Sequence, residues 1–124
     1  MQYLAVAFGG ALGAMSRFWV YNAFLKLTDG KFPFATLTVN VLGSFLLGVC
    51  FVLISEKALL TDEWRSVLMV GFLGAFTTFS TFSLDAFSML QQGEVGLGLV
   101  YILGNVLVCL LVVWMGLSLG KLLV

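Results

Sequence analysis

The sequence predicts an all-α integral membrane protein, with four transmembrane helices per subunit and a break in the third. Hydrophobic residues make up 61% of the 124 residues, and charged residues only 10%. Soluble domains carry roughly a quarter charged residues, so the mean hydropathy of +1.13 indicates a chain that lies in lipid. The few charges are clustered, and the apolar runs between them are long enough to cross a bilayer.

The apolar runs locate the four spans in chain order. The first covers about residues 2–26 and holds one charge, Arg17, before its last residue, Lys26; the others cover about residues 34–55, 65–90 and 95–119. A helix needs roughly 20 apolar residues to cross a membrane. Transmembrane β-strands alternate polar and apolar residues, which these runs do not. Because the connections are short, we expect residues 1–124 to form a single transmembrane domain.

The composition also excludes several classes of function. Six basic and six acidic residues give zero net charge, so the chain offers no basic face for nucleic acid. The absence of histidine removes His-based metal sites and His acid–base catalysis. Cys50 and Cys109 lie in apolar runs, where cysteine behaves as a small hydrophobic residue. Since the pattern contains no nucleophile–base pair or metal cluster, we expect no enzymatic activity.

The loop charges are balanced across the membrane. If the four helices alternate in direction, Lys57, Arg65 and Lys121 lie on one side, and Lys26 and Lys31 on the other. Cytoplasmic loops normally carry an excess of Lys and Arg, and this chain has almost none. We therefore expect insertion in both orientations, with two copies paired antiparallel about a two-fold axis in the membrane plane. A single four-helix bundle would be filled by its own side chains.

The third span is rich in hydroxyl groups at mid-membrane depth. Five Ser and Thr residues fall between residues 77 and 83, and Gly71 and Gly74 precede them. Ser and Thr side chains bond to nearby backbone carbonyls and bend helices, while glycine eases unwinding. The pattern predicts a break near residues 74–78, in preference to an unbroken helix that satisfies its hydroxyls internally. Irregular backbone at this depth must be buried in protein or line a wet cavity.

A break in mid-membrane creates two helix ends that suit different ions. Free carbonyl groups suit a cation, and free N–H groups suit an anion. Phe76, Phe79 and Phe82 lie in the same segment at three-residue spacing. The edge of an aromatic ring is positive and its face negative, so these rings suit either an anion or a cation. Their spacing alone favours an apolar stripe in the packed core.

Polar residues on the second and fourth spans add neutral hydrogen-bonding groups. Asn40 offers two N–H donors and one acceptor, which serve either to replace the water around an ion or to join helices. Tyr101, Asn105 and Cys109 recur every four residues and share one helix face. We expect this face to form a second polar stripe.

Two charged residues lie in or near the hydrocarbon. Arg17 needs a carbonyl, a partner or a water-filled vestibule, or it snorkels to the nearer interface. Asp85 lies near the end of the third span and is expected at the interface. The first, second and fourth spans carry no carboxylate, so they lack the titrating group that a proton-coupled exporter uses.

Three segments resemble the Fluc (CrcB-type) fluoride channels of microbes. They are Gly10-Ala-Leu-Gly-Ala-Met-Ser-Arg17-Phe18, Thr36-Leu-Thr-Val-Asn40-Val-Leu-Gly43 and the segment from Gly71 to Ser83. The similarity extends over essentially the whole chain, and the third segment is the most specific. It implies a passive fluoride-selective channel that lets fluoride leave the cell through the inner (plasma) membrane. It also implies an antiparallel, dual-topology homodimer with two pores.

The resemblance assigns roles to individual residues. It implies a pore-lining amide at Asn40, paired rings at Phe79 and Phe82, and hydroxyl tracks from Ser80, Thr81 and Thr36. It implies a structural sodium ion (Na⁺) at the dimer centre, held by the backbone carbonyls of Gly74 and Thr77, and a vestibule near Arg17. On the fourth span the family has small hydroxyl residues, where this chain offers Asn105 and Cys109, with Tyr101 on the same face.

Two other functions stay open on the sequence. A small dual-topology exporter of drugs or metabolites also has four helices per subunit. That function predicts a membrane-embedded acid on the first span, where this chain has only Arg17. A structural membrane subunit without transport activity is the third possibility.

Overall fold

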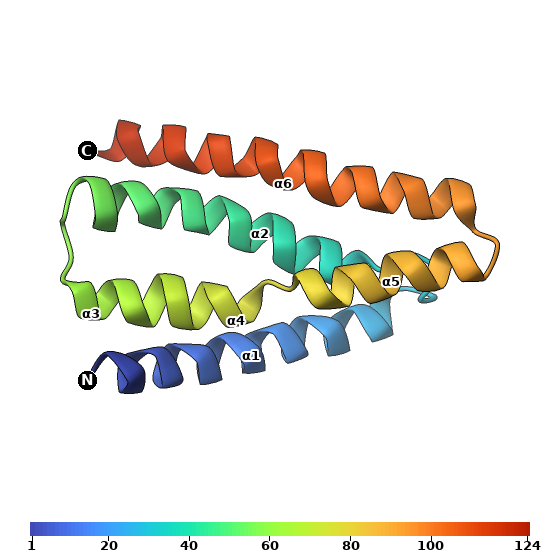
Figure 1. Cartoon of the computed structure of the whole chain (residues 1–124), viewed down its shortest axis with the longest axis horizontal. Helices are drawn as coiled ribbons and strands as arrows, with labels where there is room; N and C mark the ends of the chain where they lie inside the picture. Colours follow the sequence, from blue (N-terminus) through green and yellow to red (C-terminus); the bar gives the residue numbers. More distant parts are fainter.

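The structure, a computed structural model, describes all 124 residues and consists of helices joined by short connections (Figure 1). The symbol η marks a π-helix. In chain order the elements are α1 (Gln2–Leu27), α2 (Phe34–Cys50), η1 (Phe51–Glu56), α3 (Asp62–Arg65), η2 (Ser66–Leu73), α4 (Gly74–Phe76), α5 (Phe79–Gln91) and α6 (Val95–Leu123).

These elements form four helical spans, each long and apolar enough to cross a membrane. The spans are Gln2–Leu27, Phe34–Glu56, Asp62–Gln91 and Val95–Leu123. The prediction of an all-α protein with four membrane spans is therefore confirmed, and each predicted range lies within its span. The third span begins earlier than predicted, because Asp62 and Glu63 form its first turn. Acidic residues are favourable there, next to the positive end of the helix dipole.

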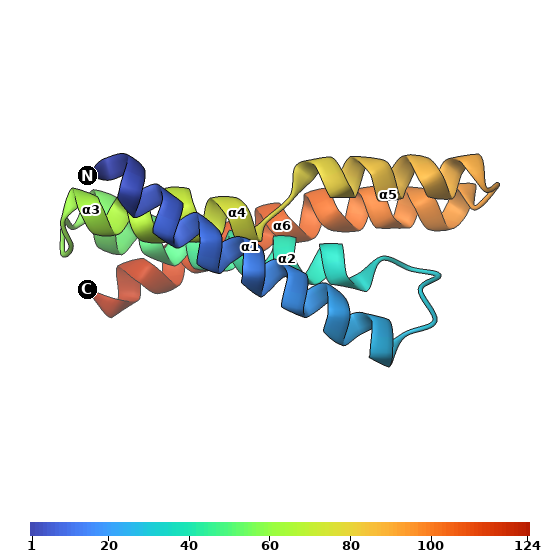
Figure 2. The ribbon, with the colours of Figure 1, turned by 90° about the horizontal axis from the view of Figure 1, so that it is seen from below.

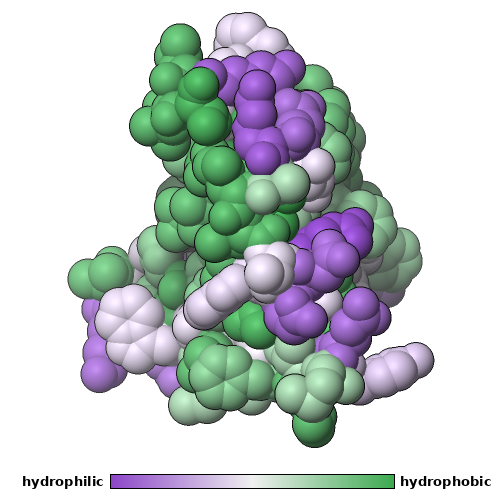
Figure 3. Space-filling model, turned by 90° about the vertical axis from the view of Figure 1, so that its left-hand side faces the viewer, coloured by the Kyte–Doolittle hydropathy of each residue, from purple (hydrophilic) through white to green (hydrophobic).

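The spans alternate in direction along the bundle. Both termini and the connection from η1 to α3 lie at one end, and the other two connections lie at the opposite end (Figure 1). Viewed from the first end, hydrophilic side chains gather among apolar ones (Figure 3). At the opposite end, Gly30 and Gly93 have φ angles of +78° and +82°. Glycine adopts this conformation without steric cost, which allows the chain to reverse direction in a few residues.

Glycine residues let the spans approach one another at backbone distance. A Cβ atom on Gly9 would overlap the carbonyl of Val67, and one on Gly116 would overlap the carbonyl of Phe45. These contacts join α1 to η2 and α2 to α6. Small residues at such contacts are typical of helices that associate in lipid. Away from the termini, α1 and α2 diverge from α5 and α6 (Figure 2).

Two segments differ from the regular α-helix that the sequence predicts. The π-helices η1 and η2 have wider turns, with hydrogen bonds from residue i to residue i+5. η2 is also the segment that packs against the glycines of α1, where Gly71 faces Gly9 and Gly10. A continuous apolar run shows no periodicity, so the sequence carries no signal for the change of helix type.

Apolar side chains cover the outside of the bundle, while its interior is small. The buried cluster contains Phe82, Ala86, Met89 and Tyr101. Large residues such as Trp19, Leu110 and Trp114 are exposed. This distribution suits a protein whose solvent is lipid, because hydrocarbon tails solvate these side chains.

Candidate functional site

The third span is interrupted at Thr77 and Thr78, between the end of α4 at Phe76 and the start of α5 at Phe79 (Figure 1). Both residues have extended backbone: Thr77 has φ −82° and ψ 161°, and Thr78 has φ −153° and ψ 118°. The predicted break near residues 74–78 is therefore confirmed. It is shorter than predicted, since Gly74 and Ala75 are still helical.

The hydroxyl groups of the two threonines stabilise both sides of the break. Thr77 Oγ1 donates to the Leu73 carbonyl at 3.0 Å, which ends the first half-helix. Thr78 Oγ1 accepts from the Thr81 N–H at 3.1 Å, so Thr78 is the N-cap of α5. An N-cap hydroxyl satisfies one of the free N–H groups at a helix start. The Ser- and Thr-rich segment therefore breaks the helix in two ways. The Thr77 hydroxyl bonds to a backbone carbonyl of α4's preceding turn, and the Thr78 hydroxyl caps α5.

Asn40 of α2 braces the extended backbone of the break. Its Nδ2 donates to the Thr78 carbonyl at 2.9 Å, and its Oδ1 accepts from the Thr78 N–H at 2.8 Å. The same Nδ2 donates to Asn105 Oδ1 at 3.2 Å. Thr78 is only 6% exposed, and buried backbone groups need partners. The Asn40 side chain therefore supplies hydrogen-bond partners to both backbone groups of Thr78, as the next helix turn would otherwise do.

Arg17 of α1 contacts the break from the other side. Its Nη1 donates to the Thr77 carbonyl at 3.3 Å. An arginine inside a membrane needs a carbonyl, a partner or a water-filled vestibule. The structure provides Arg17 with a backbone carbonyl. A cation is favourable at this position, because the carbonyl end of a helix carries partial negative charge. Arg17 also lines a cavity of about 290 Å³ with Ala14, Phe18, Tyr21 and Thr81.

A second cavity lies on the side of the break that faces α2 and α6. It has a volume of about 350 Å³, and its walls carry no charged residue. The lining residues are Asn40, Ser44, Thr77, Thr78, Phe79, Phe82, Asn105, Val106, Cys109, Leu110 and Val113. Asn105 and Cys109 line it together, as expected from their shared helix face. Neutral hydrogen-bonding groups beside aromatic rings are chemically suited to a small ion that must be bound weakly.

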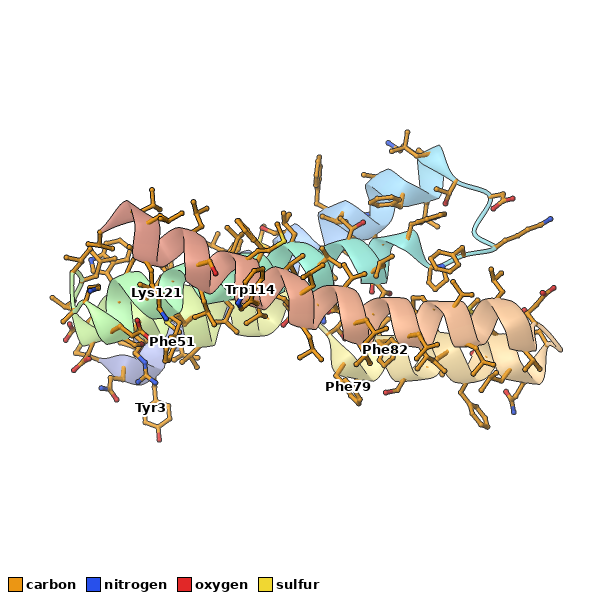
Figure 4. The ribbon with its side chains drawn as sticks, turned by 90° about the horizontal axis from the view of Figure 1, so that it is seen from above. Tyr3, Phe51, Phe79, Phe82, Trp114 and Lys121 are labelled. Atoms are coloured by element: carbon orange, nitrogen blue, oxygen red, sulfur yellow. The ribbon has the colours of Figure 1, made fainter.

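The two phenylalanines of this cavity differ in their surroundings. Phe82 is 7% exposed and packs against Tyr101, with ring centroids 5.4 Å apart. Phe79 is 76% exposed and points away from the bundle (Figure 4). The two rings also contact each other, with centroids 5.4 Å apart and an angle of 57° between planes. The packed stripe suggested by the spacing holds for Phe76 and Phe82, which are buried, and not for Phe79.

A cluster of hydroxyl groups surrounds Asp85 in the middle of α5. Its Oδ2 accepts from Thr36 Oγ1 at 2.7 Å and from the Tyr101 hydroxyl at 3.0 Å. Thr36 and Tyr101 are both fully buried, and Tyr21 is hydrogen-bonded to Thr36. The interfacial depth expected for Asp85 stays a prediction, and the structure shows that its carboxylate is turned into the bundle, where two buried hydroxyls donate to it.

Sequence reasoning placed Thr78 in the break but did not predict that it caps α5 or bonds to Asn40, and it assigned no role to Tyr21. Tyr21 follows Arg17 by four residues and so shares its helix face, which is the only available signal. Two of the predicted site residues, Thr36 and Tyr101, meet at Asp85. Four others line the cavity of about 350 Å³: Asn40, Asn105, Phe79 and Phe82. Ser80 is exposed at the start of α5 and does not line that cavity. Thr81 lines the cavity that contains Arg17.

The backbone of the break fits a hard monovalent cation. No cluster of His, Cys, Asp or Glu side chains is present to hold a metal. The Thr78 N–H bonds to Asn40, which diverts it from the Gly74 carbonyl, its usual helical partner. The Thr77 carbonyl accepts from Arg17 and keeps a second lone pair. Unwound carbonyl groups in broken membrane helices are suitable ligands for Na⁺.

Comparison with known proteins identifies relatives over nearly the whole chain. The family described as "CrcB-like protein, Camphor Resistance (CrcB)" matches residues 4–117. The fluoride-specific ion channel FluC of Hahella chejuensis is 52% identical over 117 residues, covering 94% of this chain and 92% of the relative. That of Saccharophagus degradans is 56% identical, covering 84% and 77%.

A third relative, the fluoride-specific ion channel FluC of Magnetococcus marinus, is 43% identical and covers 98% of this chain and 99% of its own length. The chain therefore belongs to the CrcB/FluC family of multi-pass membrane proteins.

Proposed function

We propose that this chain is a passive fluoride-selective ion channel that lets fluoride leave the cell through the plasma membrane. The observation that carries the proposal is the uncharged cavity beside the break, which is lined by amide, hydroxyl and aromatic groups. The FluC relatives, which are fluoride-specific ion channels by name, support the identity of the ion.

The chemistry of the cavity suits a small and strongly hydrated anion. Such an ion enters only if donors replace its water, and it leaves only if no full positive charge traps it. Asn105, Ser44 and the edges of Phe79 and Phe82 offer partial positive charge. The only nearby cation, Arg17, is engaged by the carbonyl of Thr77.

The working unit in this proposal is an antiparallel homodimer with two pores. One chain leaves Gly74, Phe79 and Ser80 exposed beside the break, and the Gly74 carbonyl has lost its helical donor to Asn40, although lipid provides no hydrogen bonds for free backbone groups. A second copy seated on this face would cover it. The balanced charges at the two ends of the bundle support an antiparallel arrangement, since neither end is favoured as the cytoplasmic one.

The dimer centre in this proposal holds a structural Na⁺ ion. The carbonyls of Gly74 and Thr77 would provide its ligands from each subunit, and the ion would neutralise the partial negative ends of the two half-helices. Preparation of the protein with N-methylglucamine in place of Na⁺ is then expected to lower both its thermal midpoint and its fluoride flux.

Ion efflux from liposomes that contain only this chain tests the function. We expect fluoride efflux without a proton gradient, and negligible chloride efflux. The carboxylate of Asp85 inside the bundle is the one feature that favours a small dual-topology exporter instead. Transport of organic cations only under a proton gradient would establish that alternative, and no transport at all would favour a structural subunit.

A further inference from the structure

A third cavity lies at the end of the bundle opposite the termini, where the connection from α1 to α2 reverses the chain (Figure 2). It has a volume of about 160 Å³, and α1, this connection, the start of α2 and α5 form its walls. Asp85 is the only charged residue among them. Four of the other lining residues are aromatic: Tyr21, Phe24, Phe32 and Phe34. The cavity therefore combines a single carboxylate with aromatic rings.

The carboxylate of Asp85 keeps one oxygen available to a ligand in this cavity. The hydrogen bonds that it accepts from Thr36 and Tyr101 both end on Oδ2. Oδ1 accepts none, and the structure contains no buried side-chain oxygen without a partner, so Oδ1 is accessible. Asp85 lines this cavity and neither of the two described above. A ligand that enters here can therefore reach Oδ1.

No Lys or Arg side chain pairs with Asp85. Its two hydrogen-bond partners are neutral hydroxyl groups. Lys26 and Lys31, the basic residues at this end of the bundle, are exposed and do not line the cavity. Arg17 lines a different cavity and donates to the Thr77 carbonyl. Charged groups inside a membrane are usually paired, so Asp85 is a negative charge that a bound cation would balance.

A divalent metal ion is a poor match for this cavity. Such ions take about six or more oxygen ligands, and the cavity offers one carboxylate. The hydroxyl groups in its walls are already engaged, that of Thr28 with the Phe24 carbonyl and that of Tyr21 with Thr36. No cluster of acidic side chains is present to hold a metal. The single carboxylate is suited to a singly charged ion.

The aromatic rings favour an organic cation. The faces of aromatic rings attract cations, and methylated ammonium groups are the ligands that aromatic cages typically bind. Phe32 and Phe34 contact each other with ring centroids 4.7 Å apart and 53° between planes, so they form a corner and not a flat wall. A volume of about 160 Å³ is also below the roughly 300 Å³ of the smallest drug-sized sites, which limits the ligand to a few heavy atoms.

We propose that this cavity binds a small methylated ammonium ion, with its charge beside Asp85 and its methyl groups against the aromatic rings. The source is a dissolved ion or the head group of a phosphatidylcholine lipid, which carries the same group. Thr36 and Tyr101, which donate to Asp85, are fully buried, so we expect the ion to bind without crossing the bundle. This inference does not rest on the proposed channel function.

The direct test is saturation-transfer NMR on the full-length chain in maltoside micelles, with tetramethylammonium as the probe. We expect saturable transfer from aromatic protons of the protein to the methyl protons of the probe. The neutral molecule tert-butanol has a similar size and lacks the charge, so it should bind at least about tenfold more weakly. No transfer to tetramethylammonium, or equal binding of tert-butanol, would overturn the inference.

Competition with short-chain lipids identifies the source of the cation. Displacement of tetramethylammonium by dihexanoyl-phosphatidylcholine, and not by dihexanoyl-phosphatidylglycerol, would support a lipid head group as the natural occupant. Binding of tetramethylammonium that neither lipid displaces would support a dissolved ion.

A matched pair of variants tests the carboxylate. Asp85→Asn keeps the shape and an oxygen that accepts from Thr36 and Tyr101, but it removes the charge, so affinity for tetramethylammonium should fall by at least about tenfold. Asp29→Asn removes an exposed carboxylate from the connection between α1 and α2 that does not line the cavity, and it should keep the wild-type affinity. Unchanged affinity in Asp85→Asn, or an equal loss in both variants, would overturn the role of Asp85.

A second pair tests the rings and leaves the hydrogen bonds of Asp85 in place. Phe34→Leu removes a ring that is 45% exposed, so the fold should tolerate the change, while affinity for tetramethylammonium should fall by about fivefold. Phe87→Leu removes an exposed ring of α5 that does not line the cavity, and it is the control. Equal affinities in the two variants would overturn the role of the rings. Loss of binding with fluoride efflux intact leaves the proposed function standing.

Discussion

Arg17 and Thr77 are joined across the first and third spans by a hydrogen bond of 3.3 Å from the guanidinium to the backbone carbonyl. The bond links the charge in the interior of the first span to the point where the third span unwinds. It gives the arginine a partner in the membrane and gives the carbonyl a donor that its helix no longer provides. The charge and the break therefore stabilise each other.

The first prediction concerns this bond. Arg17→Leu leaves the Thr77 carbonyl without its donor, and the loss of a hydrogen-bond partner at a buried group costs about 1–3 kcal/mol. We expect a lower thermal midpoint for the detergent-solubilised protein, with a smaller decrease for Arg17→Lys. Lys31→Leu removes a charge from an exposed connection and should retain the wild-type midpoint. Equal midpoints for wild type and Arg17→Leu would show that the bond contributes nothing.

The second prediction separates the two cavity phenylalanines. Phe79→Ile and Phe82→Ile should each reduce fluoride efflux by about tenfold, because each removes an aromatic edge. Only Phe82→Ile should also destabilise the chain, by about 1–2 kcal/mol, since Phe82 is buried and Phe79 is 76% exposed. Efflux and thermal midpoint are measured on the same preparations. Unaltered efflux in both variants would show that the two rings serve only in packing and do not contact the permeating ion.

The third prediction concerns the contact between α2 and α6. A Cβ on Gly116 would overlap the carbonyl of Phe45, whereas a Cβ on Gly104 of the same helix meets nothing within 4 Å. Gly116→Ala should therefore lower stability by about 1–3 kcal/mol, and Gly104→Ala should be neutral or slightly stabilising. Thermal unfolding of both variants is the measurement. A midpoint for Gly116→Ala at or above that of Gly104→Ala would contradict the packing described.

The fourth prediction tests the antiparallel dimer. Residues 29 and 60 lie in connections at opposite ends of one chain (Figure 1), so Asp29→Cys and Leu60→Cys cannot join within a subunit. In a background without Cys50 and Cys109, we expect efficient links between residue 29 of one copy and residue 60 of the other. Exclusive links between like residues would indicate a parallel dimer.

Much of the fold could be predicted from the sequence, because lipid imposes simple rules. The apolar runs located all four spans, and the hydroxyl-rich segment located the break to within a few residues. The wide turns of η1 and η2 could not be predicted, since a uniformly apolar run has no period that distinguishes helix types.

The sequence was sufficient to predict which residues form the site, but not which contacts they make. Asn40 and Asn105 are polar groups in lipid, which marks them for function. Which acceptors they use depends on pairings between spans, such as Asn40 with Thr78, that local pattern does not encode. The partners of Asp85 could not be predicted for the same reason: position along a helix gives depth, but not which face meets Thr36 and Tyr101.

The reversal potential across a planar bilayer that contains only this chain shows whether the neutral cavity beside the broken helix passes fluoride passively. Under a tenfold fluoride gradient the current should reverse at about 59 mV, the equilibrium value for one elementary charge. This value should not move when a chloride or pH gradient is added. Reversal at the chloride potential, a shift with pH, or the absence of fluoride current would show that the chain is not a passive fluoride channel.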